Sequence, residues 1–268
     1  MKNNKVMFVV NPVSGGGRTR QKWQQVERRL KHQGFSFDVN FTEHQLHACQ
    51  ITSLALQKGY DHIIAVGGDG TINEVLNGFY NPSVEGRHEA ALSVLPMGTG
   101  SDFSRVLQLS NRFEYIEKLL QNGHELDCDV VCASYTAGDG KPASRYFINV
   151  ADVGIGSDTV ARVNRNSKAL GGFLSFLIAC LTSIYLFKNP VLTVEVDGQV
   201  IFSGKSSMVA INNGQYFGGG MMIAPRAQIA DGLLDVTILK DLRKSEFLKA
   251  LPSVYKGRHL NHPKIYLA

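Results

Sequence analysis

The sequence predicts two domains: an α/β domain with a parallel sheet, followed by a mainly antiparallel β-sandwich. Short apolar runs alternate with longer amphipathic runs up to about residue 126, the order that parallel strands and crossover helices produce. From residue 127 onwards the apolar runs are short, β-rich and separated by turn signals. Three glycine-rich turns follow apolar runs in the first half, at the strand ends where parallel sheets bind ligands. We therefore expect domains at 1–126 and 127–268.

Each element of the first domain is predicted from hydrophobic periodicity. Compact apolar runs indicate strands, and apolar residues at helical spacing indicate the helices that follow them. The predicted strands are 6–10, 35–41, 63–66 and 91–95. The predicted helices are 22–33, 48–58, 71–79 and 115–121, with a helical turn at 102–107.

The second domain is predicted to be mainly antiparallel. Asp197-Gly198 is a strong two-residue hairpin signal between two apolar runs. A helical stretch at 161–187 interrupts the strands. The predicted strands are 128–134, 146–150, 191–196, 199–203, 207–212 and 234–239.

Residues 169–187 carry no formal charge and approach the length that spans a bilayer. Glycine, serine and threonine dilute the apolar residues, and no second such segment follows. We expect a buried helix or one lying on a membrane surface rather than a spanning helix.

Composition indicates a folded protein of the reducing cytoplasm. The 268 residues are 44% hydrophobic, which is enough to bury a sizeable core. The four cysteines form no C-x-x-C pair, and the run at 6–10 is too short for a signal peptide. The net charge of +5 suits anionic partners, and the basic residues near the C-terminus suit either solvent or an anionic membrane.

Three strand-end turns carry the functional signal: the first turn (11–17), the second turn (67–71) and the third turn (96–102). Their glycines allow backbone N–H groups to approach phosphate oxygens, and the helix that follows adds partial positive charge. Each turn alone is equally compatible with an ordinary tight connection, but three in one half-domain favour a phosphate site.

Side chains in these turns refine the prediction. The hydroxyls of Ser14, Thr71 and Thr99 can donate to phosphate, whereas Asp69 would repel it and so suggests a metal-bridged or structural role. Neither G-x-x-x-x-G-K-[ST] nor a helix-opening G-x-G-x-x-G is present. The residues alone therefore predict a phosphate-binding α/β domain.

Six motifs follow one another along nearly the whole chain: NPVSGGG, FTEHQLHA, GGDGTINEVLNG, LPMGTGSDFSR, NNGQYFGGGMMIAP and ADGLLDVTIL. In order and spacing they resemble those of the bacterial diacylglycerol-kinase-like lipid kinases. GGDGT also resembles NAD kinases, but its continuation INEVLNG looks like the lipid-kinase branch. That branch includes sphingosine and ceramide kinases, so the acceptor lipid stays open.

The resemblance implies an NAD-kinase/phosphofructokinase-like α/β domain, a β-sandwich and nucleotide in the cleft between them. The implied reaction transfers the γ-phosphate of Mg-ATP to a lipid hydroxyl, with diacylglycerol as the preferred acceptor and phosphatidic acid as product. Two alternatives stay open: a non-catalytic nucleotide- or lipid-binding relative, and an NAD kinase-like small-molecule kinase.

The resemblance also assigns site residues. Asp69, Asp102 and Asp127 would form a carboxylate network around Mg²⁺, largely through water, with Asp69 as the catalytic candidate, and Glu74 would support the loop. The nucleotide contacts would be Asn11, Ser14, Gly15, Gly16, Thr42, Gly67, Gly68, Asp69, Gly70, Thr71, Ile72, Asn73, Gly98 and Thr99.

A second, structural metal site is implied in QIADGLLD. There Asp231 would bind a hard cation together with backbone carbonyls near Gln228 and Leu233. The alternative is an ordinary β-turn at Asp231-Gly232.

The sequence departs from the family in two places. Ser101 stands where asparagine is common, which keeps a hydrogen-bonding side chain beside Asp102. The D-G-E turn that supplies the family's apparent general base is not in this sequence, which ends in HPKIYLA. We expect either a truncated chain or a natively short protein that binds nucleotide but transfers phosphate slowly or not at all.

The expected partner is a lipid substrate at a membrane surface, with the protein cytoplasmic and peripherally membrane-associated. No nucleic-acid partner is expected, and the sequence is compatible with a homodimer.

Overall fold

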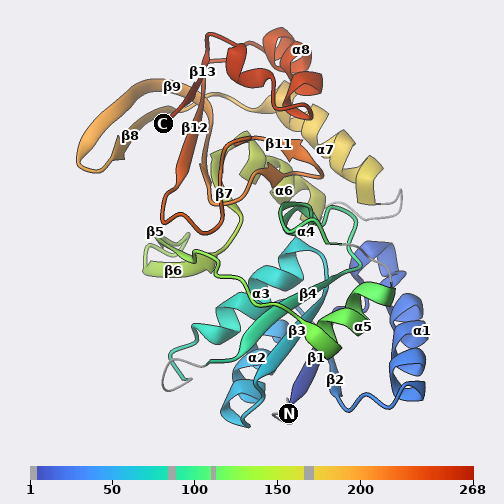
Figure 1. Ribbon diagram of the computed structural model, residues 1–268. Coiled ribbons are helices and arrows are strands. Elements are labelled where there is room, and N and C mark those ends of the chain that lie inside the picture. The colour runs from blue at the N-terminus through green and yellow to red at the C-terminus, as the bar shows by residue number, and fades with distance from the viewer. Residues whose placement is uncertain (1–4, 84–88, 110–112, 166–171) are drawn as a thin grey trace. The chain divides into compact units, whose positions relative to one another are not determined.

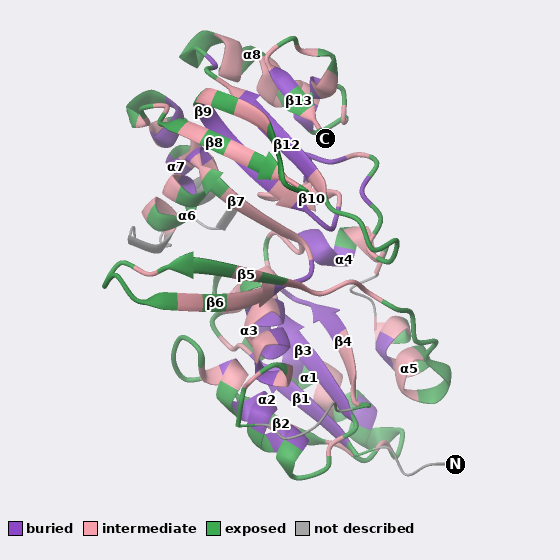
Figure 2. Ribbon diagram, turned by 90° about the vertical axis from the view of Figure 1, so that its left-hand side faces the viewer, coloured by how far each residue is buried: buried purple, intermediate pink, exposed green. Residues whose placement is uncertain are grey.

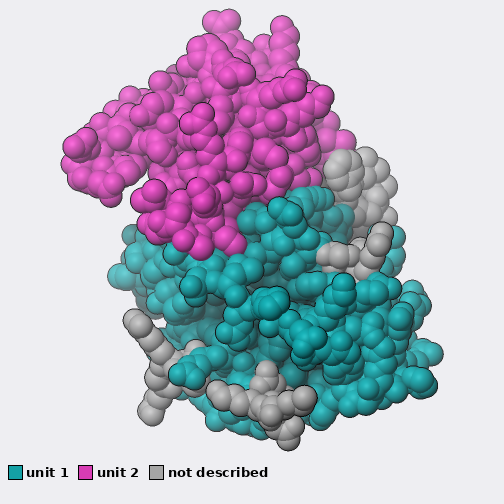
Figure 3. Space-filling model, viewed as in Figure 1, with its two compact units in different colours: residues 1–148 teal, residues 149–268 magenta. Residues whose placement is uncertain are grey.

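The computed structural model describes residues 5–83, 89–109, 113–165 and 172–268, and the side chains of 164–176 are not described. The chain forms two compact units, 1–148 and 149–268 (Figures 1 and 3). The first unit includes a hairpin at 131–147, which the predicted boundary at 126/127 assigned to the second domain. Each unit is considered by itself below.

The first unit is built on a four-stranded parallel sheet in the order β2-β1-β3-β4, as the alternating pattern predicted. Its strands are β1 (Val6–Val10), β2 (Asp38–Phe41), β3 (His62–Gly67) and β4 (Ala91–Pro96). Its helices are η1 (Ser14–Gly17), α1 (Thr19–His32), α2 (His47–Gln57), α3 (Asp69–Phe79), α4 (Asp102–Val106) and α5 (Phe113–Asn122). The unit ends in the hairpin of β5 (Val131–Thr136) and β6 (Pro142–Phe147).

Burial on both faces accounts for the continuous apolar sequences of the two central strands. Every residue of β1 and β3 is buried, because helices cover both faces of a parallel sheet (Figure 2). The rings of Phe8 and Trp23 lie 4.7 Å apart, and Phe37 packs edge-on against both. This aromatic cluster lies beneath α1 and holds the sheet that presents the three turns.

The second unit has an antiparallel sheet in the order β13-β12-β9-β7, with β8 paired to β9. Its strands are β7 (Val150–Gly154), β8 (Val191–Val196), β9 (Gln199–Asn212), β10 (Tyr216–Phe217), β11 (Met221–Met222), β12 (Asp235–Lys240) and β13 (Ile265–Leu267). Its helices are α6 (Ile155–Arg165), α7 (Gly172–Leu186), α8 (Lys244–Val254) and η3 (His259–Asn261). The fold class predicted from the sequence is therefore confirmed for both halves.

One predicted strand break is wrong. The strands expected at 199–203 and 207–212 form the single strand β9. The strand continues through Ser206 and Ser207, which are buried because Ser206 donates to the Leu239 carbonyl at 2.9 Å and Ser207 to the Lys240 carbonyl at 3.4 Å. The strand expected at 146–150 is instead divided between β6 and β7.

The helical stretch expected at 161–187 corresponds to α6 and α7, and the segment 166–171 falls outside the described residues. Among the described helices, none has the combination of length and apolar character needed to cross a bilayer. On α7, Ile184 is buried, while Ile178, Leu181 and Tyr185 are exposed at helical spacing. A cation–π contact places Lys244 4.1 Å from the centre of the Tyr185 ring.

His259 predicts a pH dependence of stability. Burial lowers its pKa below the usual 6.5, although the hydrogen bond between Nε2 and the Ile223 carbonyl, 3.0 Å, opposes this. A lowered folded-state pKa gives stability that is present above pH 6.5 and is lost as the pH falls through the folded value. We expect the melting temperature to fall below pH 6.5, and less steeply in His259→Gln.

The pH series of melting temperatures is measured by calorimetry on both chains. Buried His62, whose pKa is also lowered, keeps part of the slope in the variant. An identical slope in both chains would contradict the assignment to His259.

Candidate nucleotide site and apolar cavity

The ends of the central strands meet at one edge of the first unit's sheet. The Asn11 N–H donates to the Val66 carbonyl at 3.0 Å, which aligns the ends of β1 and β3. Thr42, just after β2, donates its N–H to the Val10 carbonyl at 2.9 Å. The first and second turns and Thr42 therefore lie at the same sheet edge, as predicted for a ligand site.

The second and third turns are in backbone contact. The N–H groups of Met97 and Gly98 both donate to the Gly67 carbonyl at 2.9 Å. A Cβ on Gly98 would overlap the Gly68 Cα and lie 2.8 Å from the Gly68 nitrogen. Glycine is required here because any side chain would force the two turns apart.

The first turn contains three consecutive glycines in the left-handed region. Gly15, Gly16 and Gly17 have φ angles of 60°, 70° and 83°, which only glycine adopts readily, and the Gly17 N–H donates to the Val13 carbonyl at 3.1 Å. Thr19 fixes this turn, since its hydroxyl lies 2.7 Å from the Ser14 hydroxyl and 3.2 Å from the Met97 carbonyl. The role of Thr19 was missed because it lies beyond the glycine run.

Thr71 is a buried hydrogen-bond acceptor rather than an open hydroxyl. The Asn11 side-chain amide donates to its Oγ1 at 3.0 Å. The N–H groups of Thr71 and Ile72 both donate to the Gly68 carbonyl, and the Ile72 side chain is in the core. At the start of α3, the N–H groups of Asp69 and Gly70 therefore have no acceptor within the helix.

Asp69 caps the short helix α4. Its Oδ2 and Oδ1 accept the N–H groups of Asp102 and Phe103 at 3.0 and 2.9 Å. Asp102 is only 5% exposed. A Cβ added to Gly100 would lie 3.4 Å from Asp69 Oδ2 and 3.8 Å from Asp102 Oδ2. The two acidic groups therefore lie close together beside the third turn.

The remaining members of the predicted carboxylate and hydroxyl set lie at the surface. Asp127 is exposed in the segment between α5 and β5, and Thr99 is exposed in the third turn. In the described part of the chain, no group of three or more histidine, cysteine or acidic side chains is arranged to hold a metal ion. A metal at this edge would need oxygen ligands from phosphate or water.

Two polar residues of α3 form hydrogen bonds to neighbouring elements. Asn73 donates to the Tyr146 carbonyl at 2.9 Å and accepts from Arg145 at 2.7 Å. Glu74 accepts the Ala48 N–H at 3.2 Å, at the start of α2. Asn73 therefore anchors the β5–β6 hairpin, and Glu74 caps α2 instead of contacting the turn.

The predicted metal turn of the second unit lies at its surface. The Leu233 N–H donates to Asp231 Oδ1 at 3.0 Å, and Gly232 has a φ of 73°, which is the geometry of an Asx turn. Gln228 is exposed, as are Asp231 and Leu233. Asp231 also helps to raise the pKa of Asp235, after burial as the larger cause, so these two carboxylates interact.

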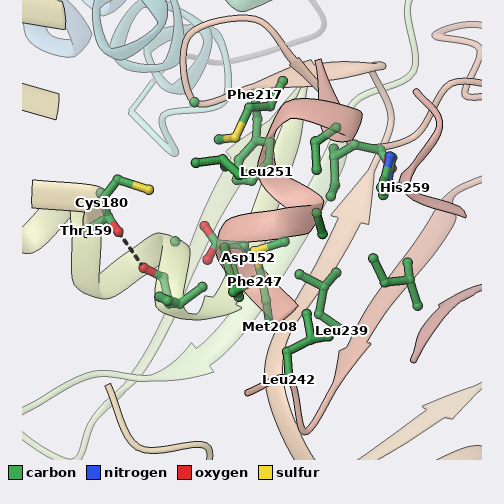
Figure 4. Close-up of a pocket in the computed structure, with 18 of the residues that line it drawn as sticks. Asp152, Thr159, Cys180, Met208, Phe217, Leu239, Leu242, Phe247, Leu251 and His259 are labelled. Atoms are coloured by element: carbon green, nitrogen blue, oxygen red, sulfur yellow. Dashed lines mark hydrogen bonds between the residues drawn. The ribbon is translucent and has the colours of Figure 1, made fainter. Parts of the chain in front are cut away.

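The second unit contains an apolar cavity of about 110 Å³ that the sequence did not predict (Figure 4). Its walls come from α6, β9, β12 and α8, and most of the lining side chains are aliphatic or aromatic. Asp152 is the one acidic residue among the described residues that line it. Burial raises the pKa of Asp152, while hydrogen bonds from Ser157 oppose the rise.

Two family profiles match the chain. The profile described as "Diacylglycerol kinase catalytic domain" matches residues 5–133, and "YegS C-terminal NAD kinase beta sandwich-like domain" matches residues 150–268. The chain belongs to the diacylglycerol kinase-like family. The two matches follow each other along the chain as the α/β and β-sheet units do.

Individual relatives of this diacylglycerol kinase-like chain agree. Diacylglycerol kinases of Staphylococcus carnosus strain TM300 and Staphylococcus aureus strain MRSA252 are 28% identical to it, over 96% of this chain and 80% and 78% of theirs. A crystal structure of a candidate diacylglycerol kinase from Bacillus anthracis strain Sterne matches with a TM-score of 0.71 and 25% identity, covering 99% of this chain and 83% of that one.

The contact between the second and third turns generates a stability prediction. Gly98→Ala should lower the free energy of unfolding by about 1–3 kcal/mol, because its Cβ must displace backbone rather than a flexible side chain. Gly70→Ala is the matched control, since nothing lies within 4 Å of its Cβ position. Urea unfolding of both variants measures the difference, and equal stability would show that the turns separate without cost.

Proposed function

We propose that the protein is an ATP-dependent lipid kinase that transfers the γ-phosphate of Mg-ATP to the hydroxyl of diacylglycerol, giving phosphatidic acid. One observation carries the proposal: three glycine-rich turns share one sheet edge, and two of them touch at Gly68 and Gly98. Membership of the diacylglycerol kinase-like family and the names of the relatives support the choice of reaction.

The turns suit a phosphate chain. The N–H groups of Gly15 and Gly16 in the first turn, and those of Asp69 and Gly70 in the second, would donate to phosphate oxygens. Ser14, Thr42 and Thr99 lie in or beside these turns and would add polar contacts. Phosphoryl transfer depends mostly on positioning and on neutralising charge, which such fixed donors provide.

Asp102 and Asp69 would hold Mg²⁺ together with the nucleotide, through water in part. Two neighbouring carboxylates fit a magnesium ion that is carried mainly by phosphate oxygens, whereas an all-protein cage would need more ligands than gather here. The metal would supply neutralisation of the charge on the transferred phosphoryl group. Asp127 would join this network only through water, because it is exposed.

The acceptor hydroxyl must lose its proton as its oxygen bonds to phosphorus. Both oxygens of Asp69 accept backbone N–H groups, so this carboxylate suits the ordering of α4 and the metal better than proton transfer. In the family the D-G-E glutamate is the apparent base. We therefore assign proton transfer to a group other than Asp69.

The acceptor would be reached at a membrane surface, with the protein cytoplasmic and peripherally associated. The cavity offers an apolar site for a lipid chain. The exposed Ile178, Leu181 and Tyr185 face of α7, with Lys244 on Tyr185, has the apolar and cationic character that binds anionic lipid interfaces.

Transfer of labelled phosphate from Mg-ATP to diacylglycerol in mixed micelles tests the reaction. We expect Asp69→Ala to reduce transfer at least about a hundredfold, because it removes a preorganised charge and frees α4. Asp61→Ala is the control, since this acidic residue precedes β3, at the opposite end of that strand from the turns.

The same assay on a chain extended by the family's D-G-E segment separates the alternatives. Transfer only by the extended chain would identify the missing proton acceptor. ATP binding without transfer by either chain to any lipid would favour the non-catalytic relative, and full activity of Asp69→Ala would refute the assigned site.

A structural cation at the Asp231 turn is a separate proposal. The interacting carboxylates of Asp231 and Asp235, at an exposed Asx turn, suit a hard cation. Chelation should lower the melting temperature of the native chain by a few degrees, and Asp231→Ala should lose this response. An equal response in both chains would leave the ordinary turn as the whole explanation.

A further inference from the structure

Arg18 follows the first turn directly and is held against it. Its Nε–H donates to the Gly15 carbonyl at 3.2 Å. Gly15 in turn lies against the third turn, because a Cβ at this position would overlap the Met97 carbonyl oxygen. The guanidinium group of Arg18 is therefore attached to the part of the sheet edge where the first and third turns meet, one residue beyond the NPVSGGG motif.

Most of the donors on this side chain are uncommitted. A guanidinium group has five N–H donors, and the bond to Gly15 uses one of them. Within the described part of the chain, Arg18 forms no ion pair and no second side-chain hydrogen bond. Because Arg18 is also exposed, its two terminal NH₂ groups are accessible to a ligand, while the bond from Nε limits where they can lie.

The groups beside Arg18 favour an anion. Helix α1 begins at Thr19 with no acidic residue in its first turn and no side-chain cap, so its first N–H groups add partial positive charge. The N–H groups of Gly15 and Gly16 come from the same short segment. A planar guanidinium matches the oxygens of a phosphate group with two parallel hydrogen bonds, so phosphate is the anion that this segment suits best.

The exposure of Arg18 favours the outer end of a phosphate chain. The N–H groups of Gly15 and Gly16 can bind only a phosphate that lies against the turn, whereas the long side chain of Arg18 can contact one that faces solvent. In the proposed reaction, the phosphoryl group that is transferred must be open to an acceptor arriving from solvent. The terminal phosphate also carries more negative charge than the inner ones, so a guanidinium group stabilises it most.

We propose that Arg18 binds the terminal phosphate of a nucleoside triphosphate through its NH₂ groups, while its Nε stays bonded to Gly15. The inference rests on the proposed function in taking a nucleoside triphosphate as the phosphate donor. Arg18 is then a specificity-determining residue, because a nucleoside diphosphate lacks the group that it contacts. The contact ends when the phosphoryl group is transferred, which favours release of the diphosphate product.

The test measures nucleotide binding to the whole chain without lipid. Calorimetric titration gives the affinities for Mg-ATP and Mg-ADP at one ionic strength. We expect the native chain to bind Mg-ATP at least about tenfold more tightly, as hydrogen bonds to a charged group allow. In Arg18→Gln the affinity for Mg-ATP should fall about tenfold and that for Mg-ADP less than about twofold, because only the triphosphate loses a contact.

Arg20→Gln is the matched control. Arg20 is exposed on the same helix, and its replacement changes the net charge by the same amount. Two residues along an α-helix turn a side chain by about 200°, so Arg20 points away from the side on which Arg18 lies. We expect this variant to keep the native ratio of the two affinities. A purely structural role of the bond from Arg18 to Gly15 would instead lower the melting temperature and weaken both nucleotides alike.

The outcomes are distinct. A triphosphate preference that is lost in Arg18→Gln and kept in Arg20→Gln supports the proposal. An unchanged ratio in Arg18→Gln, an equal loss in Arg20→Gln, equal weakening of both nucleotides, or a native chain without the preference overturns it. Transfer to diacylglycerol is measured separately. A preference that depends on Arg18 without any transfer would contradict only the proposed function, and transfer with an unchanged ratio would contradict only this inference.

Discussion

The backbone contact at Gly68 and Gly98 is the constraint on which the first unit's candidate site depends. The Gly67 carbonyl accepts two N–H groups from the third turn, so the ends of β3 and β4 must run against each other without side chains between them. Thr19 then ties the first turn to the Met97 carbonyl of the same segment. These contacts join the three turns at one edge of the sheet.

The polar side chains at this edge are largely committed to the fold. Thr71 is held by Asn11, and Asp69 caps α4, while Asn73 and Glu74 anchor neighbouring elements. Polar groups held in this way need little rearrangement when charge develops on a substrate, which is the physical basis of electrostatic catalysis. Because these side chains also hold the fold together, substituting one of them should change both the stability of the unit and its ligand affinity.

Sequence periodicity was sufficient for the sheet and its turns but not for the partners of individual side chains. The buried runs of β1 and β3 and the glycines after them were predicted, because apolar continuity and backbone freedom are local properties. The role of Asn73 was not, because its partner Tyr146 lies 73 residues away. The unit boundary in contacts also differs from the change in composition, since the β5–β6 hairpin binds α3.

The apolar cavity of the second unit was not predicted from the sequence. It depends on walls contributed by α8 and η3, far along the chain, which no local pattern reveals. The single strand β9 was likewise hidden, because its buried serines are satisfied by β12.

The length of β9 has a consequence for how the second unit folds. Its N-terminal half pairs with β8 across the two-residue turn Asp197-Gly198, where φ angles of 50° and 77° suit a tight hairpin. Such a local pairing closes in microseconds, well before strands distant in sequence can meet. The C-terminal half of the same strand then offers both of its edges, one to β7 and one to β12. Once this hairpin has formed, β9 is therefore in place to pair with β7 and β12, which form most of this unit's sheet.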